Sequence, residues 1–223
     1  MNWGKVSINT QETAWTQPLL SKDGILGGSS FAVSAISEYS SSLQACKLFD
    51  GNTTTGWAPS ENGVSSNPYI TFYNPNPLKV ALLTCTYTGV GPAQRVQGFY
   101  VVGSNDNNEW SSKLASWSGD GSGTYSVNVN STEFYKYHKI VITAANNGSR
   151  PGLNEITISA TQLTYVLNSI TFPYSHSSSD SYAPYVFLYG GGGECYVNLK
   201  TSTGMSLYNT SSATSCLYGT IGY

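Results

Sequence analysis

Charged side chains are scarce in this sequence of 223 residues: Asp, Glu, Lys and Arg together make up 10%, against about a quarter in an average globular domain. The formal net charge is −2, and lysine and arginine form no cluster. Because phosphate binding requires concentrated positive charge, we predict no nucleic-acid partner. No apolar run approaches the length of a membrane span, so we also predict no membrane insertion.

Cysteine and histidine are rare as well. The four cysteines are Cys46, Cys85, Cys195 and Cys216. No two of them are closely spaced, so they match no metal-binding motif. Two disulfides, one in each half of the chain, are one alternative, and buried thiols are the other. The first fifteen residues contain no apolar signal-peptide core, which favours reduced thiols.

Serine, threonine, asparagine, glycine and tyrosine supply the polarity that charge does not, which is typical of β-strands joined by many turns. Strands are expected over 31–36, 69–73, 79–88, 99–104, 125–129, 135–144 and 156–160. Asn74-Pro75-Asn76-Pro77 predicts a turn after the second of these, because proline cannot continue a ladder. Residues 89–97, with Arg95, and 146–152, with Arg150, are expected to be loops. Since no helical stripe is sustained, we predict an all-β antiparallel sandwich or jelly roll.

The composition divides the chain into three parts. Residues 1–28 lack periodicity and predict an extended N-terminal arm, and residues 29–161 contain the strands above. Residues 162–223 predict a smaller β-rich C-terminal module with strands over 165–172, 185–189, 195–199 and 205–208. Its only charged residues are Asp180, Glu194 and Lys200, which favours packing against a partner or other copies. The alternative is a small, independently folded β domain. The glycine run 190–193 is interpreted as a hairpin turn, because no Lys-Ser/Thr follows it as in a phosphate loop.

The stretch Ala45 to Trp57, ACKLFDGNTTTGW, places an oxygen-rich turn directly after an apolar pair. Asp50-Gly51 predicts a tight turn, since glycine accepts positive φ. Its Asp, Asn and Thr oxygens can surround a hard cation such as Ca²⁺, or they can simply satisfy nearby backbone N–H groups. The residues alone leave both alternatives open.

Five elements in order resemble the discoidin-like, coagulation-factor type C group and related carbohydrate-binding modules with a galactose-binding-like fold. They are Leu48-Phe49-Asp50-Gly51-Asn52 with Thr55 and Trp57; Tyr69-Ile70-Thr71-Phe72; Phe99 to Asp106 with Trp110; Tyr137-His138-Lys139-Ile140-Val141-Ile142; and Leu153-Asn154-Glu155-Ile156. The resemblance implies a galactose-binding-like jelly-roll sandwich over 29–161, with Trp57, Phe99 and Trp110 in its core.

The resemblance also implies a structural cation site on the oxygen-rich turn. The ligands it implies are backbone oxygens of Lys47, Asn52 and Asn154, carboxylates of Asp50 and Glu155, and the hydroxyl and carbonyl of Thr55. Such an all-oxygen shell with two carboxylates is appropriate for Ca²⁺.

A sugar site is expected in the loops at one end of the sandwich, where members of the family bind ligands. Arginine and asparagine can contact vicinal hydroxyls, and a tyrosine face can stack on a sugar. The candidates are Tyr39, Glu61, Asn62, Tyr87, Arg95, Asn147 and Arg150. Galactose-binding members often place a histidine after the tryptophan of the turn motif, and Ala58 stands there, which argues against galactose.

We predict no catalytic residues. The only histidines are His138 and His176, and no Ser or Cys stands in a G-x-S-x-G context. Glu38, Glu61 and Asp50 could supply a carboxylate pair for glycoside hydrolysis, but Asp50 fits the ion turn better.

The first functional hypothesis is a virion structural protein, such as a bacteriophage fibre, tail or capsid-decorating protein. Its discoidin-like domain would bind carbohydrate on the host surface or in mucus, and it would assemble with other virion proteins and its own copies, as a trimer in a fibre. The alternative is a secreted or cell-surface lectin-like module, for example from a glycoside hydrolase. A purely architectural protein that keeps the fold without sugar binding is the third hypothesis.

Overall fold

The computed structural model describes residues 2–7, 10–90, 93–165, 168–171, 182–189, 195–201, 204–209 and 215–222. They divide into two compact units. One comprises Thr13–Leu163, and the other joins Met1–Glu12 to Thr164–Tyr223. The expected boundaries at 28 and 161 therefore differ from the division in the structure, in which the first twelve residues belong with the C-terminal segment.

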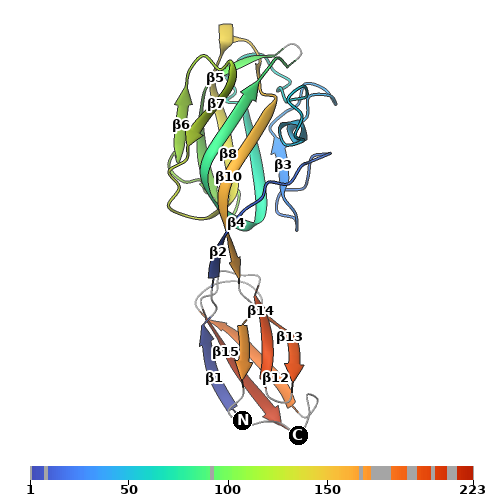
Figure 1. The fold of residues 1–223 in the computed structure, drawn as a ribbon, viewed down its shortest axis with the longest axis vertical. Helices are drawn as coiled ribbons and strands as arrows, with labels where there is room; N and C mark the ends of the chain where they lie inside the picture. The colour runs from blue at the N-terminus through green and yellow to red at the C-terminus, as the bar shows by residue number, and fades with distance from the viewer. Residues whose placement is uncertain are drawn as a thin grey trace. The chain divides into compact units, whose positions relative to one another are not determined.

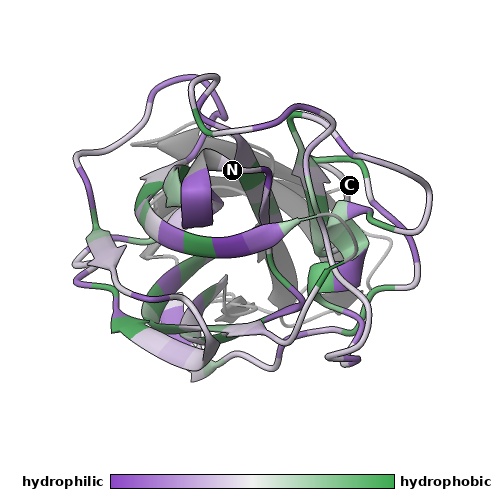
Figure 2. Cartoon of the chain, turned by 90° about the horizontal axis from the view of Figure 1, so that it is seen from above, coloured by the Kyte–Doolittle hydropathy of each residue, from purple (hydrophilic) through white to green (hydrophobic). Residues whose placement is uncertain are grey.

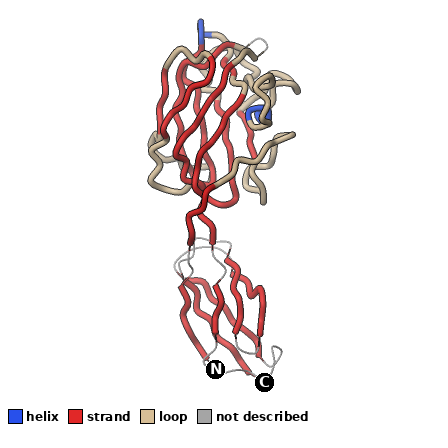
Figure 3. The backbone as a smooth tube through the Cα atoms, viewed as in Figure 1, coloured by secondary structure: helices blue, strands red, loops and turns tan. Residues whose placement is uncertain are grey.

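The larger unit is a β-sandwich (Figure 1). The described strands of its sheet are β2 (Thr10–Ala14), β3 (Ala32–Ala35), β4 (Tyr69–Tyr87), β5 (Gln94–Ser104), β6 (Ala115–Ser118), β7 (Gly123–Asn128), β8 (Tyr135–Ala145), β9 (Pro151–Gly152) and β10 (Glu155–Tyr165). The start of β2 and the end of β10 extend past the bounds of this unit. Two short 3₁₀ helices, η1 (Ala45–Leu48) and η2 (Asn146–Gly148), lie between strands. Figure 3 shows both helices among the loops of this unit. The all-β galactose-binding-like sandwich predicted from the sequence is confirmed.

The long strand β4 joins the two layers of the sandwich. Its first part pairs with β3 and β8, and β8 in turn pairs with β5, which pairs with β6. Its second part pairs with β7 and β10, and β10 pairs with β2. The ladders of β4 with β3, β7, β8 and β10, and those of β5 with β6 and β8, are antiparallel. In contrast, β9 pairs with β5 in parallel. One strand thus contributes to both faces of the core.

The prediction of a turn at Asn74–Pro77 is wrong. The structure continues β4 through these residues as an irregularity, with the ladder to β8 interrupted between Tyr73 and Leu78. The Asn74 side-chain amide donates to the Asn76 carbonyl oxygen (2.6 Å). Prolines 75 and 77 fall where no ladder partner is required, so their missing N–H groups do not end the strand. The predicted loop over 89–97 is likewise shorter, because β5 begins at Gln94.

The core contains the large side chains that both layers direct inward. Phe49, Trp57, Phe72, Phe99 and Ile140 are fully buried or nearly so. Along the strands in Figure 2, hydrophobic and hydrophilic residues alternate, as strands with one buried face require. The core positions predicted for Trp57 and Phe99 are confirmed.

The prediction for Trp110 is wrong, because this ring is only half-buried and faces the ammonium group of Lys139 (3.9 Å to the ring centroid). Cys46 and Cys85 are both buried and free. The disulfide alternative is therefore wrong for this half of the chain.

The described residues of the smaller unit form two three-stranded sheets. Its strands are β1 (Asn2–Ser7), β11 (Asn168–Thr171), β12 (Tyr182–Tyr189), β13 (Cys195–Thr201), β14 (Gly204–Asn209) and β15 (Ser215–Gly222). The sheet orders are β1-β15-β12 and β11-β14-β13, with antiparallel ladders throughout. The first residues therefore form a strand against the last strand of the chain, and not the extended arm that their lack of periodicity suggested.

Two sequence predictions in this unit fall on residues that the structure leaves undescribed. The glycine turn over 190–193 lies outside the described residues, and so does His176. For Cys195 and Cys216 only the backbone strands are described.

Candidate functional site

The oxygen-rich turn follows η1 and is held by its own side chains. Asp50 Oδ1 accepts the Asn52 N–H (3.0 Å), and Gly51 has φ +74°. The Thr55 hydroxyl lies 2.8 Å from Asp50 Oδ2 and 2.9 Å from the Asn52 carbonyl oxygen. The Lys47 ammonium group stands 3.6 Å from Asp50 Oδ2. Local hydrogen bonding therefore gathers the Asp50, Asn52 and Thr55 oxygens in one place.

Glu155, at the start of β10, adds a second carboxylate to this turn. It is 8% exposed, and its Oε2 is buried without a hydrogen-bond partner among the described residues. Burial, and secondly the negative charge of Asp50, raise the pKa of Glu155 to about 7, although the N–H groups of Gly51 and Asn52 lower it. The negative charge of Asp50 therefore disfavours the ionised form of Glu155, and a proton or a cation at the orphaned oxygen would relieve this repulsion.

Close approach of two chain segments brings Glu155 to the turn. Trp57 and Leu153 exchange both backbone N–H···O bonds (2.9 and 3.2 Å). A Cβ on Gly56 would lie 2.3 Å from the Leu153 carbonyl oxygen, so only glycine fits this position. The buried Asn154 amide then donates to the carbonyl oxygens of Thr55 (2.9 Å) and Gly89 (3.1 Å), and its Oδ1 accepts the Thr88 N–H (2.8 Å).

These residues fit a hard cation. The orphaned Glu155 oxygen, the Asp50 carboxylate and the carbonyl and hydroxyl oxygens of the turn form an all-oxygen donor set with two negative charges. The described residues contain no group of three or more His, Cys, Asp or Glu side chains able to hold a metal, so such an ion would depend on backbone oxygens as well.

The predicted ligand residues Tyr39 and Arg150 meet at one end of the sandwich. The Arg150 guanidinium carbon lies 4.1 Å from the Tyr39 ring centroid, and Arg150 Nη2 donates to the Ser60 carbonyl oxygen (2.8 Å). Tyr39 is fixed through its N–H to the Ala58 carbonyl oxygen (2.9 Å), and it remains 47% exposed. We call Tyr39, Ser60 and Arg150 the end-loop cluster.

Three other predicted ligand residues lie close to this cluster in the chain. Glu61 and Asn62 are exposed and directly follow Ser60. Asn147, in η2, is exposed and adopts the left-handed conformation (φ 56°) three residues before Arg150. The role of Ser60 was not predicted from the sequence, because it acts through its backbone oxygen and no side-chain pattern signals that.

Tyr87 and Arg95 are engaged elsewhere. The Tyr87 hydroxyl donates to the Ala93 carbonyl oxygen (3.1 Å), and its ring packs on a small cluster with Ala58, Val90 and Ala93. Arg95 forms an ion pair with Asp120 (2.9 Å). Ala58, at the position where galactose-binding members often have histidine, is fully buried.

Glu38 and Asp23 form a separate carboxyl pair at the start of η1. Glu38 Oε1 accepts the Ala45 N–H (2.7 Å), and Asp23 Oδ1 accepts the Cys46 N–H (2.6 Å). Burial, followed by hydrogen bonding with Asp23, raises the pKa of Glu38. Both carboxyl groups thus satisfy backbone N–H groups that a helix start leaves free.

Residues 32–160 match the family model of the F5/8 type C domain. The match covers more than half of the chain, and the chain belongs to this family, as its fold and turn motif predicted. The comparison with curated proteins returned no match. The described residues contain no helix with the length and apolar character needed to cross a bilayer.

Several solved structures are similar to the chain. CpGH89CBM32-5 from Clostridium perfringens, in complex with GalNAc-β-1,3-galactose, is 18% identical, with a TM-score of 0.49 over 58% of this chain and 94% of that one. An F5/8 type C domain from Bacteroides fragilis is 15% identical (TM-score 0.48; 58% and 90% covered). The family 32 module of Clostridium perfringens NanJ, in complex with galactose, is 16% identical (TM-score 0.46; 60% and 93% covered).

Proposed function

We propose that the Thr13–Leu163 unit is a non-catalytic carbohydrate-binding domain whose ligand contacts the end-loop cluster. The observation that carries this proposal is the Arg150 guanidinium lying 4.1 Å from the Tyr39 ring centroid, with Nη2 anchored on the Ser60 carbonyl. Membership of the F5/8 type C family supports it, because the group that the chain resembles includes carbohydrate-binding modules that use end loops.

The chemistry of the cluster suits a pyranose. A sugar can pack its C–H face on exposed aromatic surface while its hydroxyls contact polar groups around the ring. Arg150 supplies donors in a planar arrangement that can contact two adjacent hydroxyls. Glu61 and Asn62, exposed beside Ser60, add acceptors and donors at the rim. Because Ala58 is buried, we propose that the ligand is recognised without a contact at that position and is not selected as galactose.

A glycan array followed by titration calorimetry tests this proposal. We expect Tyr39→Ala and Arg150→Ala each to weaken the best glycan at least about tenfold, which is 1.4 kcal/mol, while the melting temperature changes little. Tyr87→Phe is the matched control, because its hydroxyl is engaged with Ala93 and binding should stay within about twofold. Glycan binding that survives both alanine variants would exclude the end-loop cluster, and no binding to any glycan would favour a purely architectural domain.

We further propose that the turn at Asp50 and Glu155 holds a structural Ca²⁺. Asp50 and Glu155 would supply carboxylate oxygens, and Lys47, Asn52, Thr55 and Asn154 the remaining oxygens. The ion would neutralise the charge of the two carboxylates and so fasten the start of β10 to the turn. We assign it no part in chemistry at the sugar.

For the place of the protein, we propose either an extracellular or cell-surface glycan-binding module or a component of a virion. The family match favours the glycan-binding module, because it covers only the larger unit and gives no support to a role in a virion. The virion proposal depends on the smaller unit acting in assembly, for which the low charge of residues 162–223 is the support.

A further inference from the structure

The outer face of the β4–β8–β5–β6 layer carries a second group of aromatic and hydroxyl side chains. Tyr69 on β4 and Tyr100 on β5 are both cross-strand partners of Val141 on β8. Directly paired residues point to the same face of a sheet, so both rings lie on one surface. Val141 is 6% exposed but does not belong to the main core cluster, which places it under these outer side chains.

Two lysines lie over these rings. Lys113 Nζ is 4.5 Å from the Tyr100 ring centroid, and Lys139 Nζ is 4.5 Å from Tyr69 and 3.9 Å from Trp110. Within the described part of the chain, no carboxylate stands within ion-pair distance of either ammonium group. In a protein of net charge −2, this face therefore presents two positive charges without a counterion.

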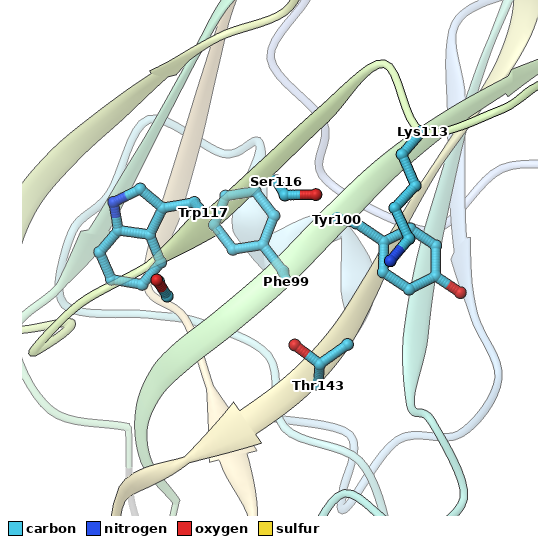
Figure 4. Close-up of a pocket in the computed structure, with 7 residues that line it drawn as sticks. Phe99, Tyr100, Lys113, Ser116, Trp117 and Thr143 are labelled. Atoms are coloured by element: carbon cyan, nitrogen blue, oxygen red, sulfur yellow. The ribbon is translucent and has the colours of Figure 1, made fainter.

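A hollow of about 210 Å³ opens beside Tyr100 (Figure 4). Lys113 reaches over the Tyr100 ring at one side, and the hydroxyl-bearing side chains of Ser116 and Thr143 line the space. Trp117 forms a further wall, and its ring stacks with Phe99 (5.6 Å between centroids) and with Tyr125 (4.0 Å). These two ring contacts fix the orientation of Trp117, while Ser116 and Thr143 stay exposed.

We propose that this face, defined by Tyr69, Tyr100, Trp110, Lys113, Lys139 and Thr143, is a second saccharide-binding surface that takes an anionic polysaccharide. We call it the lysine–tyrosine face. It goes beyond the proposed function, because it shares no residue with the end-loop cluster and requires a charged polymer.

The chemistry favours a charged sugar chain over a neutral one. A pyranose can stack its C–H side on aromatic surface, and the hydroxyls of Ser116 and Thr143 can exchange hydrogen bonds with ring substituents. Each ammonium group can then pair with a carboxylate or sulfate of the chain, with three donors that adapt to either. Partial burial lowers the pKa of Lys139, as expected for an ammonium group drawn from water onto aromatic rings without a carboxylate.

The spacing suits a polymer. Tyr69 and Tyr100 flank β8 on opposite sides, so their strands lie roughly 10 Å apart, which is twice the spacing of neighbouring strands. A single monosaccharide cannot contact both rings, whereas a short run of linked sugars can. The alternative role for these lysines is to cover aromatic surface with their methylene stems. If the lysines only cover aromatic surface, binding should not depend on the charge of the polymer. Comparing an acidic polymer with its neutral counterpart therefore distinguishes the two roles.

The test is affinity electrophoresis of the full chain in gels containing polygalacturonate or dextran sulfate, with methyl-esterified pectin and dextran as the matched neutral polymers. The first pair tests carboxylate and the second sulfate. The variants are Lys113→Gln/Lys139→Gln and Tyr100→Ala. The control is Lys22→Gln/Lys136→Gln, which removes the same charge from two lysines that are not among the residues defining the lysine–tyrosine face. Arg150→Ala reports separately on the end-loop cluster.

We expect at least one acidic polymer to retard the protein and its neutral counterpart to do so far less. The Lys113→Gln/Lys139→Gln variant should bind about tenfold more weakly, as the loss of two charge pairs, one exposed and one partly buried, predicts. The control and Arg150→Ala should stay within about twofold. The proposal is overturned if neither acidic polymer retards the chain, if the neutral polymers retard it equally, or if the control loses as much affinity. Loss only in Arg150→Ala would move acid recognition to the end-loop cluster.

Discussion

At the scale of single residues, His138 is a buried base without a hydrogen-bond partner. Both ring nitrogens are enclosed and unpaired among the described residues. Its ring stacks on Phe72 (4.9 Å between centroids, 7° between planes) and meets the edge of Tyr135. Burial alone lowers the pKa of His138 to about 3, so the folded state holds it neutral and uses it as an aromatic core residue.

This histidine should make the larger unit less stable in acid. The unfolded chain binds a proton at His138 below pH 6.5, whereas the folded chain does so only near pH 3. Between these values the unfolded state holds more protons, so the free energy of unfolding rises with pH by up to about 1.4 kcal/mol per unit. We expect His138→Phe to flatten this slope between pH 4 and 6 and to melt higher than the parent at pH 5.

Urea unfolding at several pH values measures the slope. Tyr135→Phe is the matched control, since it alters the neighbouring ring and leaves the histidine in place. Carboxylates also titrate in this range, so the quantity to compare is the difference between parent and variant. Equal slopes in the parent and in His138→Phe would show that the histidine is protonated equally in both states.

The sequence predicted local residue arrangements better than distant ones. The Asp50-Gly51-Asn52 turn was recognisable because its hydrogen bonds join residues two to five positions apart. The contact of Tyr39 with Arg150 was not, although each residue was a candidate, because it depends on where two loops end after the sandwich has closed. The prediction for Arg95 failed for the same reason. Its ion pair with Asp120 depends on how the strands are arranged, and this ion pair engages the guanidinium group that was expected to contact a sugar.

At the scale of elements, the turn after η1 and the start of β10 form a clasp. The Trp57–Leu153 bridge and the Asn154 amide hold the two segments together, and the close approach at Gly56 leaves no room for a side chain. The exception is the orphaned Glu155 oxygen beside the Asp50 charge. The backbone groups of the clasp thus have hydrogen-bond partners, whereas its two carboxylates carry excess negative charge. A divalent cation would neutralise that charge.

The Asp50→Asn variant distinguishes the contribution of a bound cation to stability from that of the hydrogen bonds in the clasp. With Ca²⁺ at about 100 times Kd, binding to the folded state alone stabilises it by about 2.7 kcal/mol, roughly 5–10 °C in Tm for a unit of this size. We expect this Ca²⁺-dependent rise in the parent and its loss in Asp50→Asn. With chelator, the variant should melt close to the parent, because the side-chain oxygen still accepts the Asn52 N–H and repulsion with Glu155 is removed.

Differential scanning calorimetry with Ca²⁺ and with chelator measures both quantities. Asp120→Asn is the control, because it removes an exposed carboxylate far along the chain from the turn. A Ca²⁺ response that persists in Asp50→Asn would assign the ion to another place, and no response in the parent would leave the clasp to its hydrogen bonds.

Strand pairing set a second limit on prediction. The inward pattern of β8 and β10 was readable, because alternation marks a strand with one buried face. The continuation of β4 through two prolines was not, since it depends on an interrupted ladder that only the partner strand reveals. The pairing of β1 with β15 joins residues more than two hundred positions apart, and neither strand shows a pattern that identifies the other.

At the scale of the whole molecule, the chain consists of two units with different chemistry. The main core cluster of buried residues lies entirely between Phe31 and Ala160, inside the Thr13–Leu163 unit. The smaller unit draws its strands from both ends of the chain. Its segment from residue 162 onward has only three charged residues, fewer than a freely solvated surface usually carries. We therefore propose that glycan recognition belongs to the larger unit and self-association to the smaller one.

This division predicts that the larger unit folds alone and that the smaller one causes association. We expect a fragment of residues 13–163 to unfold cooperatively and to bind the same glycans as the full chain, because it retains the core and the end-loop cluster. The fragment should be monomeric by light scattering, whereas the full chain should form a homo-oligomer at the same concentration under reducing conditions. A full chain that is monomeric under these conditions would contradict the assembly role and, with it, the proposal of a virion component. A fragment that fails to fold would instead show that strands from the smaller unit complete the sandwich.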